Sequence, residues 1–153
     1  MGVYCDTNFL VRLYATAPSR EQALNRISAQ DRRGQRIPIT WLHELELTNA
    51  LQQMVLLARA GTGMSFTPEQ ASLGQLQFED DLREARRFAA TSLAPREMVH
   101  QAGELSLRHT ARHGFRAYDV AHVACALILK CERFWSFDVR ASKLAQLEGM
   151  KTL

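Results

Sequence analysis

Four acidic side chains stand at the edges of apolar segments. Asp6 directly follows a short apolar run at the start of the chain, and Asp138 follows another near its end. Asp119 opens a strongly apolar stretch, and Glu46 has a leucine on either side. Carboxylates that converge in one cleft raise one another's pKa, so such a cluster needs cations. Mg²⁺ or Mn²⁺ would suit it, because hard cations bind carboxylate oxygens and keep waters for substrate phosphates. If these acids meet in space, they predict metal-assisted phosphodiester cleavage.

Each of these acids also has a structural interpretation. Asp119 could be a helix N-cap or first-turn acid, worth about 1 kcal/mol to a helix. Asp138 could equally cap the last helix. Glu46 could lie on the solvated edge of an amphipathic helix, and Glu44 still more so. Asp6 is harder to explain in this way, because so few residues separate the first strand from the turn that follows it.

The elements that must position these acids alternate between short strands and helices. The sequence predicts strands over 2–5, 37–39 and 134–137, with 88–93 as a strand or a loop. Apolar spacing and N-cap residues predict helices over 7–14, 19–34, 40–61, 67–87, 95–114, 119–129 and 140–147. This alternation indicates an α/β fold with a parallel sheet. Parallel sheets place their sites at the C-terminal ends of strands, which is where Asp6 and Asp138 are expected.

Composition limits the class of protein. A length of 153 residues with 46% hydrophobic residues predicts one globular domain over 1–153. The balance of 19 Lys and Arg against 16 Asp and Glu permits a polyanionic partner. Three cysteines without C-x-x-C spacing argue against a zinc site and indicate buried reduced thiols. Without an apolar run of about 20 residues or signal-peptide features, we expect a cytoplasmic protein with no membrane span.

Four segments of the chain together resemble a known family. They are YCDTNFLV, ITWLHELELTNAL, RAYDVAHVACAL and FWSFDVRASKLA. In order and spacing they resemble the PIN-domain family, particularly ribonucleases of the VapC toxin class. In that family an opening strand ends in Asp followed by Thr or Ser and then Asn or Ser. A helix then carries a Glu, a later helix begins with Asp, and a final strand ends in Thr/Ser-x-Asp.

The resemblance implies a site, a fold and partners. It implies a three-layer α/β sandwich with a central, mostly parallel sheet flanked by helices. It also implies Mg²⁺- or Mn²⁺-dependent RNA cleavage, homodimers and a small antitoxin partner. Carried over to this sequence, the family's residues are Asp6, Glu46, Asp119 and Asp138 as catalytic residues, the three aspartates as metal ligands, and Asn8 and Ser136 as polar support. Of the two neighbouring glutamates we choose Glu46, because Ala50 follows it by four positions.

Basic residues near the acidic motifs are candidates for RNA contacts. They are Arg12, Arg112, Arg116 and Arg140. Guanidinium groups suit phosphate because their planar fork can bind two oxygens, and such binding weakens with salt. His122 follows Asp119 by three positions, but its apolar neighbours favour a satisfied core residue over a catalytic one.

Other classes fit less well. A haloacid-dehalogenase-like phosphatase needs a second Asp where this chain has Asn8, and no lysine stands in a convincing motif for it. A P-loop enzyme is excluded because G-x-x-x-x-G-K-[ST] is missing. A catalytically silent PIN-like module that binds RNA or protein stays open as the alternative.

Overall fold

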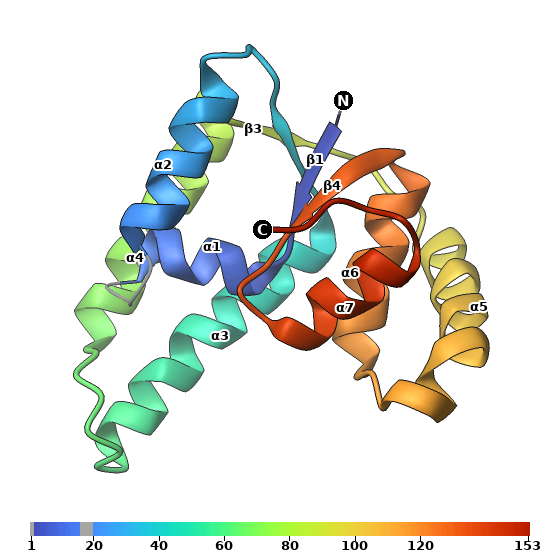
Figure 1. Cartoon of the computed structure of the whole chain (residues 1–153). Helices are drawn as coiled ribbons and strands as arrows, with labels where there is room; N and C mark the ends of the chain where they lie inside the picture. The colour runs from blue at the N-terminus through green and yellow to red at the C-terminus, as the bar shows by residue number, and fades with distance from the viewer. Residues whose placement is uncertain (1, 16–19) are drawn as a thin grey trace. The chain divides into compact units, whose positions relative to one another are not determined.

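The computed structural model describes residues 2–15 and 20–153 (Figure 1). The chain divides into two compact units. We call Met1–Asn8 together with Thr91–Leu153 the terminal unit, and Phe9–Ala90 the middle unit. Within the described ranges, no helix is long and apolar enough to cross a membrane.

The terminal unit is built on two parallel strands. β1 (Gly2–Cys5) lies beside β4 (Cys131–Trp135), as Figure 1 shows. Their register sets Cys5 opposite Trp135, and the N–H of Asp6 donates to the carbonyl of Trp135 at 3.0 Å. The ladder thus extends to the end of both strands. The first residues after each strand therefore emerge at the same edge.

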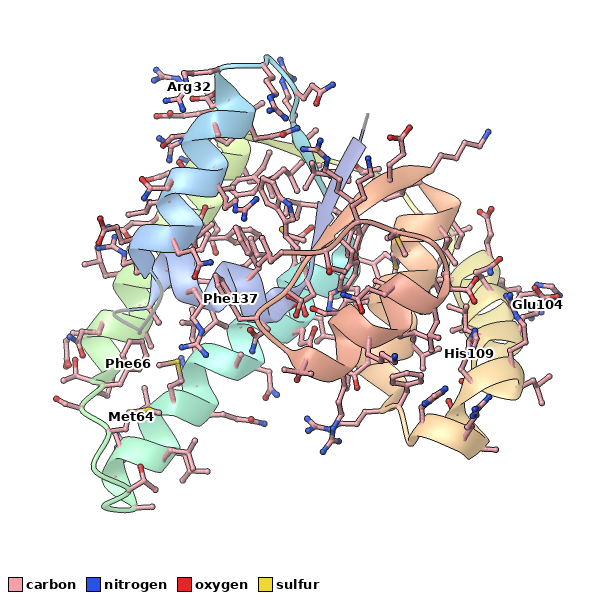
Figure 2. All side chains as sticks on the ribbon, viewed as in Figure 1. Arg32, Met64, Phe66, Glu104, His109 and Phe137 are labelled. Carbon is pink, nitrogen blue, oxygen red and sulfur yellow. The ribbon has the colours of Figure 1, made fainter. Side chains whose placement is uncertain are left out.

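The helices of the terminal unit are α5 (Pro95–His113), α6 (Ala117–Ile128) and α7 (Val139–Leu147). α6 packs against both α5 and α7 (Figure 1). Its residues from 119 to 126 are all buried, and apart from Asp119 and His122 their side chains are apolar and mostly small. Nε2 of His109 on α5 (Figure 2) donates to Oε1 of Glu148, the C-cap of α7, at 2.7 Å and so links the two helices.

The middle unit has its own parallel pair, in which Ile37 faces Phe88. α3 and α4 pack on each other, and Phe66 in the loop between them is buried (Figure 2). Pro68 begins α4, and Thr67 caps it by accepting from the N–H of Gln70. The elements of the middle unit are α2 (Arg20–Asp31), β2 (Ile37–Ile39), α3 (Trp41–Arg59), α4 (Pro68–Glu84), β3 (Phe88–Ala90) and most of α1 (Thr7–Tyr14).

These elements confirm the predicted α/β class with parallel strands. Strands 2–5 and 37–39 and helix 7–14 have the predicted bounds, and 88–90 forms a strand. The predicted start of the second helix at Ser19 lies outside the described residues. The sixth helix begins at Ala117, two positions before its predicted start, because Arg116 rather than a later residue is the N-cap.

Three predicted boundaries were wrong by several residues. The second helix, predicted to end near Gly34, ends at Asp31, because residues 32–34 form a turn in which the N–H of Gly34 donates to the carbonyl of Asp31 at 2.8 Å. The strand predicted at 134–137 runs from Cys131 to Trp135. Lys130, at φ 53°, turns the chain from α6 directly into the strand, which leaves 136–138 free to form the α7 cap. The helix predicted to reach residue 87 ends at Glu84, because Ala85 adopts the left-handed conformation at φ 50°.

Candidate active site

The hydroxyl of Ser136 joins two of the predicted acids. Its Oγ donates to Oδ2 of Asp6 at 2.6 Å and accepts from the N–H of Asp138 at 2.8 Å. Asp6 and Ser136 are both 4% exposed. This is a short, charge-assisted hydrogen bond in a buried setting. The structure therefore brings Asp6 and Asp138 to the same edge of the β1–β4 pair.

Asp138 is the N-cap of α7, and Asp119 in the first turn of α6 accepts from the N-cap residue of that helix. Both roles are those that the structural interpretation predicts. Asp138 Oδ1 accepts from the N–H groups of Arg140 at 2.7 Å and Ala141 at 3.4 Å. Asp119 Oδ2 accepts from the N–H of Arg116 at 3.1 Å. Among the described residues, the second carboxylate oxygen of each aspartate accepts no hydrogen bond. Capping therefore leaves one oxygen of each aspartate open to a ligand.

The charge of Asp119 is difficult to maintain. Burial raises the pKa of its carboxyl, and the nearby negative charge of Asp138 raises it further. The N–H of Arg116 and the positive charges of Arg116 and Arg140 lower the pKa only in part. These interactions place the two aspartates within electrostatic reach of each other. A desolvated carboxylate beside a like charge gains most from a bound cation.

A buried network ties α6 to the end of β1. The Tyr4 hydroxyl lies 2.8 Å from Nδ1 of His122, and Oγ1 of Thr7 lies 3.2 Å from Nε2. All three side chains are buried. The prediction that His122 is a satisfied core residue is confirmed. Its partners were not predicted from the sequence, although a lone histidine on an apolar helix face requires them.

Asn8 presents an oxygen that lacks a partner. Its Oδ1 is buried, and no hydrogen bond reaches it from the described part of the chain. Leaving such a group unsatisfied costs about 1–3 kcal/mol, so the position suits a bound water or cation. Asn8 follows Asp6 by two residues, in the first turn of α1, and its amide oxygen is a neutral donor of the kind that hard cations bind.

The donor chemistry of this edge fits a hard cation. Within 2–15 and 20–153, no three His, Cys, Asp or Glu side chains are arranged to hold an ion by themselves. Mg²⁺ usually binds to only one or two carboxylates and keeps several waters, so it does not need such a group. Asp6, Asp119 and Asp138 offer carboxylate oxygens, and the orphaned Asn8 oxygen is of the same hard kind.

The remaining predicted residues divide between the units. Glu46 lies on α3 and Arg12 on α1, both in the middle unit, and both are half-buried, whereas Glu44 is exposed. The other predicted arginines lie in the terminal unit, are exposed and form no salt bridge with any described residue: Arg112, Arg116 and Arg140.

The cysteines do not take part in this chemistry. Cys5, Cys125 and Cys131 are free and buried. Burial raises the pKa of Cys125 and Cys131 to about 11. Burial, followed by the negative charge of Asp6, raises the pKa of Cys5 well above its usual range. Neutral thiols are poor nucleophiles and ligands, so these residues are packing groups.

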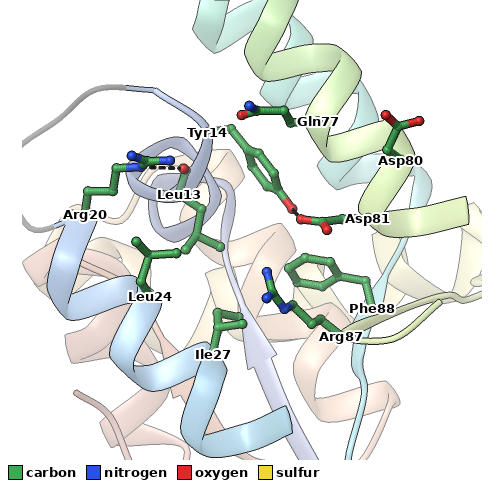
Figure 3. A pocket seen from close by; sticks show the side chains of 10 residues that line it. All are labelled: Leu13, Tyr14, Arg20, Leu24, Ile27, Gln77, Asp80, Asp81, Arg87 and Phe88. Atoms are coloured by element: carbon green, nitrogen blue, oxygen red, sulfur yellow. Dashed lines mark hydrogen bonds between the residues drawn. The ribbon is translucent and has the colours of Figure 1, made fainter. Parts of the chain in front are cut away.

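The middle unit contains a pocket that the sequence did not predict. Its volume is about 290 Å³, and residues of α1, α2, α4 and β3 line it (Figure 3). Tyr14 donates to Oδ2 of Asp81 at 2.7 Å, and Nε of Arg20 donates to the carbonyl of Leu13 at 3.2 Å. Arg87 and Phe88 also line the pocket, as Figure 3 shows. The pocket combines apolar walls with fixed charges.

The family model of the PIN domain matches residues 3–147, so the chain belongs to the PIN-domain family. No curated protein matches its sequence significantly. Among solved structures it is similar to VapBC2 from Rickettsia felis bound to a DNA fragment from the VapBC2 promoter. The TM-score is 0.68 and the sequence identity is 14%, over 100% of this chain and 98% of that chain.

Two further structures show the same likeness. VapC20 from Mycobacterium tuberculosis, a toxin that cleaves the sarcin-ricin loop, has a TM-score of 0.61 and 17% identity, over 93% of this chain and 94% of that chain. FitAcB from Neisseria gonorrhoeae has a TM-score of 0.61 and 11% identity, over 99% of this chain and 96% of that chain. At these identities the likeness shows the fold.

Proposed function

We propose that this protein is a Mg²⁺- or Mn²⁺-dependent endoribonuclease that hydrolyses phosphodiester bonds in RNA. One observation carries the proposal. In a PIN-family chain, the hydroxyl of Ser136 links the carboxylate of Asp6 to the backbone N–H of Asp138, and the negative charge of Asp138 acts on Asp119. In this proposal the three aspartates hold the cation, with Glu46 as a fourth catalytic acid. Asn8 and Ser136 orient the ligands, since partners of this kind usually fix ligand orientation.

The chain's own residues prepare the site for hydrolysis. The hydrogen bond from Ser136 fixes the orientation of the Asp6 carboxyl group. When bound, the cation supplies Lewis acidity that activates water and offsets charge on the departing oxygen. The oxygen of water bonds to phosphorus and gives up a proton to solvent, while the bond to the ribose oxygen breaks and that oxygen takes up a proton. Arg12, Arg112, Arg116 and Arg140 contribute positive charge for the flanking phosphates, so binding should weaken with salt.

We also propose that the enzyme is the toxin of a toxin–antitoxin pair, acts in the cytoplasm as a homodimer, and folds as a single domain. The family model spans both units, and VapC20 is named as a toxin. Exposed leucines on the helices of the middle unit suit an antitoxin helix, because apolar grooves commonly bind amphipathic segments. They are Leu45 and Leu56 on α3 and Leu73 and Leu76 on α4.

Asparagine variants of the aspartates test the nuclease proposal. Asp6→Asn and Asp119→Asn should each lower cleavage of total RNA by roughly 1,000-fold or more, since each removes a charged metal ligand. Folding, followed by circular dichroism, and RNA binding should largely persist. Glu46→Gln should also lose cleavage, while Glu44→Gln, on an exposed side chain of the same helix, serves as the matched control.

Thermal unfolding gives a readout that does not depend on activity. Saturating Mg²⁺ should raise the melting temperature of the parent protein by several degrees, because a ligand at 100 times its Kd stabilises by about 2.7 kcal/mol. Asp119→Asn should melt no lower than the parent without Mg²⁺, since it removes a desolvated charge, and should gain little from Mg²⁺. Cleavage in EDTA, or full activity in both aspartate variants, would contradict the proposal. Parent protein that binds RNA without cutting it would favour the silent module.

A further inference from the structure

Two exposed apolar side chains stand beside the aspartates in the first turns of α6 and α7. Tyr118 is 53% exposed and Val139 is 82% exposed. Tyr118 immediately precedes Asp119, and Val139 immediately follows Asp138. From residue 119 to 126 every side chain of α6 is buried, so Tyr118 stands where this helix leaves the core. About half of the Tyr118 side chain and most of the Val139 side chain are therefore open to solvent.

The backbone directs the Tyr118 side chain toward the open end of α6. Side chains of an α-helix tilt toward its N-terminus, so those of the first turn project past that end. Asp119 lies in the same turn, and adjacent Cα atoms are about 3.8 Å apart. α7 packs against α6 and presents Asp138 within electrostatic reach of Asp119. A nucleotide whose phosphate lies at the aspartates would therefore have its base within reach of the ring.

The tyrosine has no evident structural role at this position. Its hydroxyl makes no hydrogen bond with any residue in the described ranges. A tyrosine in the second helical position caps nothing, and aromatic residues are mediocre helix formers. What remains is an accessible aromatic face. Every nucleic-acid base can stack on such a face, whatever its sequence.

The charges around this ring favour a polyanion. Arg116 caps α6 and Arg140 is the second residue of α7. Both side chains are exposed, and neither forms a salt bridge with a described residue. An apolar protein segment would gain less here, because it offers no hydrogen-bond acceptor to the two exposed guanidinium groups.

We propose that Tyr118 is a base-stacking residue that binds an unpaired nucleotide next to the bond being cut. Val139 provides a second apolar contact, and Arg116 and Arg140 bind the flanking phosphates. In duplex RNA the base faces are covered by neighbouring pairs, so stacking on Tyr118 selects single-stranded segments. This inference rests on the proposed nuclease function and names a residue that determines which RNA is accepted.

Binding to defined RNA tests the proposal in an Asp6→Asn background, where the probe should survive. The probe is a fluorescein-labelled, unpaired RNA of about 12 nucleotides, free or annealed to its complement. Adding Tyr118→Ala should weaken binding of the unpaired RNA roughly 10-fold and leave duplex binding unchanged. Tyr118→Phe should bind as the background does. Leu107→Ala, which alters another exposed apolar residue (87%) of the terminal unit, should have no effect.

An abasic scan locates the stacked base. In the otherwise unmodified enzyme, Tyr118→Ala should raise KM more than it lowers kcat. When bases of the RNA are removed one at a time, a single position beside the cut bond should show non-additivity. There, loss of the base and loss of the ring should together cost no more than either change alone. If circular dichroism shows that the Tyr118→Ala variant does not fold, the Tyr118→Leu variant takes its place in these measurements.

Three results would overturn the inference while leaving the nuclease proposal intact. The first is unchanged affinity of Tyr118→Ala for unpaired RNA. The second is an equal loss for unpaired and duplex RNA. The third is unchanged RNA affinity together with loss of binding to the candidate antitoxin, for which the probe is the purified protein encoded by the reading frame next to this one. That result would assign the surface to a protein partner. If the background binds no RNA and the parent cuts none, the proposed function fails and this inference falls with it.

Discussion

The two units use their buried polar side chains differently. In the terminal unit, the side-chain hydrogen bonds of His122 and Asp6 join residues separated by 115 to 130 positions. In the middle unit, the part-buried bond from Tyr14 to Asp81 spans 67 positions. The side-chain hydrogen bonds of the fully buried Thr40 and Gln30, by contrast, join residues separated by only 3 and 5 positions. The first kind connects segments that meet only in the tertiary structure, whereas the second completes helix ends and turns.

This difference separates positioning from scaffolding. Long-range buried bonds fix how β1, β4 and α6 meet, and the carboxylates lie where these elements meet. A buried network is favourable only when all its members are satisfied, so its loss should affect both stability and chemistry. Local caps stabilise individual helices, and their loss should affect stability alone. The following predictions test this contrast from the largest expected effect to the smallest.

The largest effect is expected from His122→Ala. It leaves the Tyr4 hydroxyl and Thr7 Oγ1 without their buried partner and opens a cavity. We expect the free energy of unfolding to fall by about 3–5 kcal/mol, measured by urea denaturation. RNA cleavage should fall as well, because α6 carries Asp119. His122→Gln, which restores one polar partner, should recover part of both losses. An alanine variant of native stability would show that the network is dispensable.

A glycine pair tests packing in the two units. A Cβ added to Gly74 in α4 would lie 2.5 Å from the carbonyl oxygen of Tyr14, whereas one added to Gly103 in α5 would meet nothing within 4 Å. Gly74→Ala should therefore destabilise by about 1–3 kcal/mol. Gly103→Ala should stabilise by about 0.5–1 kcal/mol, because it removes a flexible residue from a helix interior. Thermal melts that rank the two variants in the opposite order would contradict this account of α4 packing.

The smallest loss of stability is expected for a local cap, which we compare with a long-range hydroxyl. Ser136→Ala should destabilise by about 1–3 kcal/mol and lower cleavage roughly 10–100-fold, because Asp6 loses its donor. Thr67→Ala should cost about 1 kcal/mol without changing the rate per folded molecule. Ser136→Thr keeps the hydroxyl and is the matched control. Equal cleavage rates for Ser136→Ala and Thr67→Ala would contradict the assignment of positioning to the terminal unit.

Much of the fold could be predicted from local patterns. Thr67-Pro68-Glu69 marks the start of α4, and Gly114, at φ 69°, marks the end of α5. Prediction failed where the deciding interaction is not local. Ala85 and Lys130 adopt left-handed conformations that their residue types do not indicate, so α4 ended early and β4 began early.

The candidate site shows the same division. The acids could be selected from the sequence because each stands at the edge of an apolar element, and the family resemblance ordered them. The hydroxyl of Ser136 between Asp6 and Asp138, and the partners of His122, could not. The catalytic roles of these residues, including Glu46, stay predictions for the asparagine and glutamine variants to decide.

The sequence by itself determined the α/β class, most helix ends, and a set of carboxylates suited to a hard cation. These depend on apolar periodicity, capping and residue type, which act over a few positions. Only the tertiary structure decided that Asp6 meets Ser136 across 130 positions, and that Asp119 bears a raised pKa beside Asp138. The physical reason is that such contacts depend on strand register and helix packing, which no local pattern of residues specifies.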